Sequence, residues 1–244
     1  MTQVPGKKRP SPCITQDEFN PTFGQPPRGE HAGRQDRPGI VVGVSDIIPR
    51  WTANKTDPTK LLYFVVRDGF ASDADKKYAA DAFQAAAKQW NDIGFGVNIS
   101  AAPDKARAHF LVKYYKPKMG DRDENTLARA FFPNSVSDVV IYDTSLTDPF
   151  WRKYLMNTLL HEIGHIIGLR HEFALDRKQD GTLRESTPAQ RFGSVNEHSV
   201  MSYDDINDIK DTDIKDVKAF YELENRSLLN GVPITDYTPK PLGP

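Results

Sequence analysis

The residues best suited to chemistry lie in the segment HEIGHIIGLRH, residues 161–171. In a helix of 3.6 residues per turn, His161 and His165 lie on one face about one turn apart, so both imidazoles can reach one Zn²⁺. If that helix continued, His171 would lie about 9 Å further along the axis and nearly opposite His165. Gly168 offers a solution, because glycine adopts the left-handed conformation that ends helices and redirects the chain. The spacing therefore predicts a zinc site with three histidine ligands.

The predicted site has a base beside the metal. Three neutral imidazoles leave one position of Zn²⁺ open for water, which is typical of a catalytic rather than a structural site. Glu162 follows the first ligand directly and is expected to reach that water. The metal lowers the pKa of the water and polarises a carbonyl, while Glu162 accepts the proton and later passes it to the leaving amine. The expected reaction is peptide-bond hydrolysis without a covalent intermediate.

Two other functions are consistent with these residues. A zinc hydrolase that acts on a non-peptide amide would use the same metal chemistry. A catalytically silent module that binds zinc and a protein partner would need the histidines but not the base. Glu162 therefore favours an enzyme over a purely structural zinc site.

The same segment resembles the zinc motif of the metzincins, whose signature continues with a methionine turn. Residues 199–203, SVMSY, follow His171 by about 30 residues and resemble that turn. The resemblance implies a zinc metalloendopeptidase in which Met201 forms a hydrophobic floor beneath the histidines. As in astacins and serralysins, Tyr203 would bind the metal at rest and swing away to support the transition-state oxyanion. Alternatively, Tyr203 packs its ring and donates a single hydrogen bond.

The resemblance extends upstream of the zinc motif, over roughly residues 47–224. Residues 126–133, TLARAFFP, are similar to the cleft-edge strand of matrixins and serralysins, which pairs with substrate. An exposed strand edge can bind an extended peptide by strand addition. Overall, the sequence most resembles uncharacterised fungal matrixin-like proteins, which carry His-Glu-Phe-Ala after the zinc motif. The residues expected to contact substrate are Leu127, Ala128, Arg129 and Ala130.

Two further residues invite comparison with subfamilies. Cys13, in the sequence PSPC, is similar to the matrixin cysteine switch, in which a propeptide thiolate occupies the open zinc position until it is removed. The flanking residues depart from the matrixin pattern, and a lone cysteine in an arm can also be incidental, so Cys13 is a candidate latency ligand. Glu172 resembles an acid that anchors a buried chain end in astacins, although the long leader here departs from that arrangement.

The elements that position these residues follow from periodicity. A helix is expected from Ser72, which forms a capping-box pattern with Asp75, to Gly94, with apolar residues at helical spacing. Helices are also expected over residues 150–168 and 213–223. Short β-branched or aromatic runs predict five strands, at residues 61–66, 95–100, 108–115, 125–132 and 138–142. The predicted fold is an α/β (α+β) metzincin-like domain, with a twisted, mostly parallel five-stranded mixed sheet, two long helices and a small irregular C-terminal lobe containing the third helix.

Composition divides the chain into three parts. Residues 1–46 are rich in Pro, Gly, Arg and Gln and predict a flexible arm or pro-segment. Residues 47–230 are expected to form the catalytic domain. Residues 231–244 are expected to form a tail.

Charge and hydropathy limit the partners of the 244-residue chain. Its 32 basic and 33 acidic side chains are balanced and indicate no nucleic acid. No run approaches the roughly 20 apolar residues that span a bilayer. No secretory signal is recognisable, so we expect a cytoplasmic or non-classically secreted protein, unless a signal has been removed. The expected partner is a protein or peptide substrate, with a monomer favoured.

Overall fold

The computed structural model describes residues 11–13, 40–177, 181–193, 196, 198–202 and 206–243. Its central sheet has the strand order β1-β7-β8-β6-β4-β5, in which only the pairing of β7 with β8 is antiparallel. The five strands predicted from the sequence all form, and β1 adds a sixth strand at the edge. The strands are β1 (Ser11–Cys13), β4 (Thr59–Val65), β5 (Val97–Ala101), β6 (Phe110–Tyr115), β7 (Thr126–Arg129) and β8 (Val139–Tyr142).

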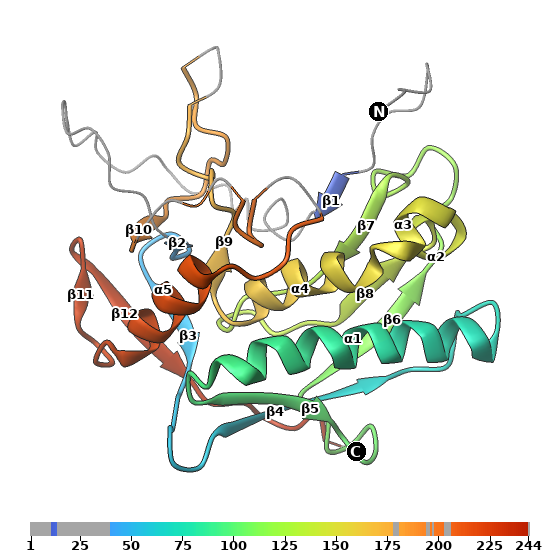
Figure 1. Cartoon of the computed structure of the whole chain (residues 1–244), viewed down its shortest axis with the longest axis horizontal. Helices are drawn as coiled ribbons and strands as arrows, with labels where there is room; N and C mark the ends of the chain where they lie inside the picture. Colours follow the sequence, from blue (N-terminus) through green and yellow to red (C-terminus); the bar gives the residue numbers. More distant parts are fainter. Residues whose placement is uncertain are drawn as a thin grey trace.

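The first long helix forms as its sequence predicts. Helix α1 (Asp73–Ile93) begins after Ser72, whose side chain accepts a hydrogen bond from the backbone N–H of Asp75, and ends at Gly94 with φ 73°. Its apolar side chains are buried. The helix lies beside helix α4 (Leu155–Ile166) and against the sheet (Figure 1). Trp90 joins the two helices, because its Nε1 donates to the carbonyl of Leu160 at 2.9 Å.

The predicted helix at residues 150–168 is two helices, and this prediction was too simple. A short helix α2 (Thr144–Thr147) precedes α3 (Pro149–Lys153), which Asp148 caps through the backbone N–H groups of Phe150 and Trp151. Tyr154 leaves helical geometry, with φ −103° and ψ 15°, before α4 begins. We find no glycine or proline that explains this break. Helix α4 is buried over its second half, as expected for an interior helix.

Two small three-stranded sheets and helix α5 (Asp211–Glu222) form the second lobe. One sheet has the order β10-β2-β9 and the other β11-β12-β3. Strand β2 lies within the range expected to be an arm, and β12 within the expected tail; both pair with partners distant in sequence. The strands are β2 (Ile40–Val42), β3 (Ile48–Trp51), β9 (Leu169–Arg170), β10 (Gln190–Phe192), β11 (Leu228–Leu229) and β12 (Val232–Tyr237).

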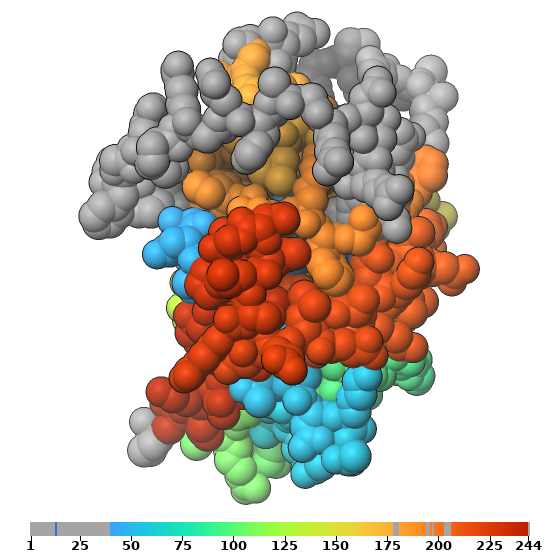
Figure 2. Space-filling view, turned by 90° about the vertical axis from the view of Figure 1, so that its left-hand side faces the viewer, coloured from blue at the N-terminus to red at the C-terminus, as the bar shows by residue number. Residues whose placement is uncertain are grey.

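A buried arginine ties these strands to α5. The guanidinium of Arg50 donates to Asp236 Oδ1 at 2.7 Å and to the carbonyls of Phe220 and Leu223. Figure 2 views this side of the molecule and shows the red C-terminal segments spread between light-blue patches from the segment after residue 40. No helix in the described part of the chain is long and apolar enough to cross a membrane.

Candidate metal centre

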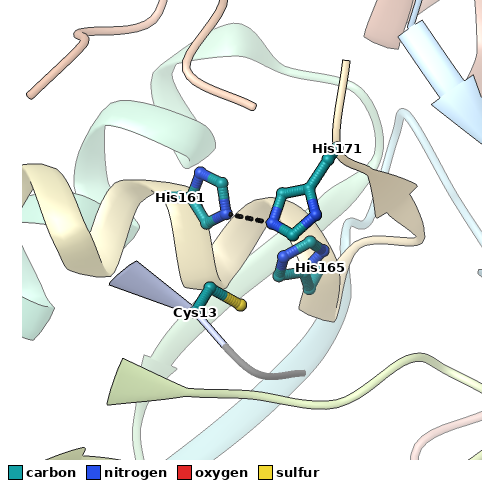
Figure 3. A group of neighbouring side chains, drawn as sticks. All are labelled: Cys13, His161, His165 and His171. Atoms are coloured by element: carbon teal, nitrogen blue, oxygen red, sulfur yellow. Dashed lines mark hydrogen bonds between the residues drawn. The ribbon is translucent and has the colours of Figure 1, made fainter. Parts of the chain in front are cut away.

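Three histidines meet at the end of α4 (Figure 3). His161 and His165 come from the helix and His171 follows β9, and each residue is at most 5% exposed. The three ring centroids are 4.9 Å apart in every pair. The ligand atoms of the three histidines and of Cys13 all lie within 4.8 Å of one another. The four residues therefore converge on one point.

The hydrogen bonds of the outer ring nitrogens, Nδ1, show whether the inner nitrogens, Nε2, are available to bind a metal. Nδ1 of His161 lies 2.9 Å from the carbonyl oxygen of Val200, and Nδ1 of His165 lies 2.8 Å from that of Leu169. A carbonyl oxygen only accepts hydrogen bonds, so both Nδ1 atoms carry the proton and both Nε2 atoms present a lone pair. Burial lowers the pKa of His161 to about 3 and that of His165 well below its usual value. Both rings are therefore neutral, as metal ligands must be.

The inner nitrogens of the three rings lie close together. Nε2 of His161 and Nε2 of His171 face each other at 3.0 Å. The buried Nε2 of His165 has no hydrogen-bond partner among the described residues. The Nε2 lone pairs of His161 and His165 are directed to this point and are available to coordinate a cation. Imidazole nitrogens around an open position suit Zn²⁺.

Gly168 performs the turn that its sequence position predicts. Its φ is 94°, and its N–H donates to the carbonyl of His165 at 2.9 Å, which closes the helix. The chain then enters β9, which pairs with β2, so that His171 returns toward the first two histidines. A Cβ at Gly168 would lie 2.4 Å from the carbonyl oxygen of Pro49. Both the conformation and the space at this position therefore require glycine.

The methionine turn lies directly under the helix. Met201 is buried, and a Cβ at Gly164 would lie 2.1 Å from its Sδ. The sulfur therefore packs against the helical turn that separates His161 from His165. Ser199 anchors the turn to α5, because its hydroxyl donates to Asp213 Oδ1 at 2.7 Å and accepts from the N–H of Met201.

The expected substrate-binding edge is paired with the N-terminal strand. Strand β1 runs parallel to β7, with Cys13 opposite Ala128. Leu127, Ala128 and Ala130 are buried, whereas Arg129 is partly exposed. Figure 3 shows the sulfur of Cys13 directed toward the histidines. The same short strand therefore lies on the predicted edge and brings a thiol to the predicted metal position.

Of the other residues that the sequence singled out near the site, the structure describes Glu162 and Glu172 but not Tyr203. Glu162 is fully buried in α4 between the two helical ligands. Tyr203 lies outside the described residues. Glu172 is buried and accepts a hydrogen bond from the N–H of Asn196; burial raises its pKa to about 7.

Sequence reasoning missed Glu185, which lies 14 residues after His171. Its Oε1 is 2.6 Å from Nδ1 of His171, and its Oε2 accepts from the guanidinium of Arg170 at 2.5 Å. Burial opposes ionisation of Glu185, yet contacts with His171 and Arg170 lower its pKa to about 2. No motif marks this residue, because the segment that carries it has no regular period.

The mixed sheet, the two long helices and the histidine cluster define a metzincin-like zinc peptidase. Residues 50–212 match the family described as matrixin, and because this match covers more than half of the chain, the chain belongs to that family. It is accordingly a zinc-dependent metalloendopeptidase.

Two proteins are among the solved structures that are similar to this chain. Myroilysin has a TM-score of 0.47 and 12% identity, over 75% of this chain and 99% of that one. High choriolytic enzyme 1, a hatching-enzyme zinc protease from the medaka Oryzias latipes, has a TM-score of 0.42 and 10% identity, over 72% and 95%. No curated protein sequence matches the chain.

Proposed function

We propose that the chain cleaves extended protein or peptide substrates and that Glu162 is the general base of the reaction. The observation that carries this proposal is the convergence of three histidines on one point, with the fully buried Glu162 directly after the first of them in α4. A site that only held zinc would not need a carboxylate in that position. The non-peptide hydrolase and the silent zinc-binding module are the alternatives that the experiment below distinguishes.

The residues of the site would have three roles: metal binding, proton transfer and substrate alignment. His161, His165 and His171 would hold zinc, which supplies Lewis acidity toward the scissile carbonyl and toward water. Glu162 takes a proton from the attacking water and returns it to the departing amine. Strand β7 aligns the substrate backbone by strand addition, and its pairing with β1 supports this use of the edge.

The test is cleavage of a diverse peptide mixture by the zinc-loaded Cys13→Ser chain, which lacks the thiol beside the histidines, read by mass spectrometry. A Glu162→Ala variant prepared in the same way controls for contaminating peptidases. Cleavage that disappears in this variant supports the proposal and also gives the sequence preference. If the Cys13→Ser chain bound one zinc and cleaved no peptide, the non-peptide hydrolase or the silent module would replace it.

We further propose that the full-length chain is latent, with the Cys13 thiolate in the fourth position of the zinc. Two observations support this: the sulfur lies within 4.8 Å of all three histidine ligand atoms, and β1 covers the edge on which substrate would pair. Thiolate is a strong zinc ligand, so it would exclude water from the metal. The arm would therefore block the metal and the substrate edge together.

The Cys13→Ser chain is expected to have a kcat/KM at least about tenfold above that of the unmodified chain, since each lost 1.4 kcal/mol of blocking interaction corresponds to about a factor of ten. Initial rates on one peptide from the cleaved set measure this. In parallel, iodoacetamide should label Cys13 in the metal-free protein and spare it in the zinc-loaded protein. Equal rates for the two chains would show that the thiol does not inhibit.

A further inference from the structure

We infer that Glu185 is a positioning residue that fixes the ring of His171 and thereby sets the zinc affinity of the site. This inference rests on the proposed zinc chemistry and adds a residue outside the motif to it. The contact that carries it is the 2.6 Å approach of Glu185 Oε1 to Nδ1 of His171. With Nδ1 donating to the carboxylate, Nε2 of His171 keeps its lone pair for the metal.

The three histidines are held in different ways. The backbone carbonyls of Val200 and Leu169 hold His161 and His165, so these contacts depend only on the local fold. His171 instead contacts a carboxylate. An anionic acceptor makes the imidazole a stronger electron donor than a neutral carbonyl does. The third ligand is therefore the one whose strength depends on a single side chain.

Glu185 is itself held in place by a buried cation. Arg170 is 1% exposed and directs Nε and Nη2 to Glu185 Oε2, at 3.1 and 2.5 Å. Its Nη1 also donates to the carbonyl oxygens of Gly43 and Thr187. One carboxylate thus spans two consecutive residues, with one oxygen on Arg170 and the other on His171. This arrangement orients the carboxylate and compensates its partly buried charge.

The test measures zinc binding rather than cleavage. The zinc Kd of the full chain is measured by competition with a chromophoric chelator, for the unmodified chain and for Glu185→Gln and Glu185→Ala. Loss of such an outer partner weakens metal binding by about 10- to 100-fold. We expect the alanine variant to reach that range. Glutamine, which still accepts a hydrogen bond but carries no charge, should fall between alanine and glutamate.

Asp176→Asn is the matched control, because Asp176 belongs to the same segment and pairs with Arg191 at 2.7 Å instead of a histidine. Its Kd should be unchanged. Circular dichroism of the metal-free proteins identifies any variant that fails to fold, and the nearly isosteric glutamine variant then decides the result. A Kd for folded Glu185→Gln equal to that of the unmodified chain would overturn the inference.

The outcomes also separate this inference from the proposed function. If the Cys13→Ser chain bound zinc and cleaved no peptide, the peptidase proposal would fail while the order of the three Kd values still tested Glu185. If the unmodified chain bound no zinc, both would be overturned.

Discussion

Glu162→Gln is expected to lower kcat on a cleaved peptide by about 10²- to 10⁴-fold, the usual contribution of a general base, while zinc remains bound. Glutamine matches the volume of glutamate in the fully buried position on α4 but cannot accept a proton. The measurement combines kcat with the zinc content of the same sample. Both are made in the Cys13→Ser chain, so that the arm does not mask the result.

The control for this prediction is Glu222→Gln. Glu222 is an exposed carboxylate at the end of α5 that pairs with Lys55 at 2.6 Å, far in sequence from the motif. Its replacement should leave kcat unchanged. A Glu162→Gln protein that kept both its zinc and its kcat would assign the base to another residue.

Gly168→Ala is expected to destabilise the protein by about 3 kcal/mol or more, through backbone strain and overpacking together. Alanine is disfavoured at a φ of 94°, and its Cβ would lie 2.4 Å from the rigid carbonyl oxygen of Pro49. For a chain of this size, that corresponds to a Tm about 6 to 12 °C lower. Thermal unfolding of the metal-free protein, followed by circular dichroism, measures the shift.

Gly120→Ala separates the two causes. Gly120 has a φ of 87°, close to that of Gly168, but nothing lies within 4 Å of its Cβ position. This variant therefore reports the conformational cost without the collision. An equal fall in Tm for the two variants would show that the contact with Pro49 contributes nothing.

The parts that were predicted from the sequence depend on local spacing. Helix α1 begins after Ser72 and ends at Gly94. These ends were predictable because an N-cap hydrogen bond and a left-handed glycine each depend on only a few neighbouring residues. The same holds for His161, His165 and the turn at Gly168, whose relation follows from helix geometry alone. The long α1 helix and the five central strands were predictable for the same reason.

The parts that were not predicted depend on contacts between distant segments. Asp236 and Arg50 form an ion pair 186 residues apart, and the strands that carry them have no alternating pattern. Glu185 contacts His171 across an irregular segment. Because that segment has neither helical nor strand periodicity, the sequence gives no signal of the contact. The break at Tyr154 was not predicted either, and no nearby residue marks it.

The position of β1 has a further consequence for how such a protein would be switched on. Residues 14–39 join Cys13 covalently to β2, so an inhibitory thiol on this chain acts at an effective concentration that dilution cannot change. A free peptide of the same sequence would have to match that effective concentration to inhibit equally well. One cut between Cys13 and β2 would remove this advantage, and the three residues of β1 would then compete with substrate as an ordinary, dilutable ligand.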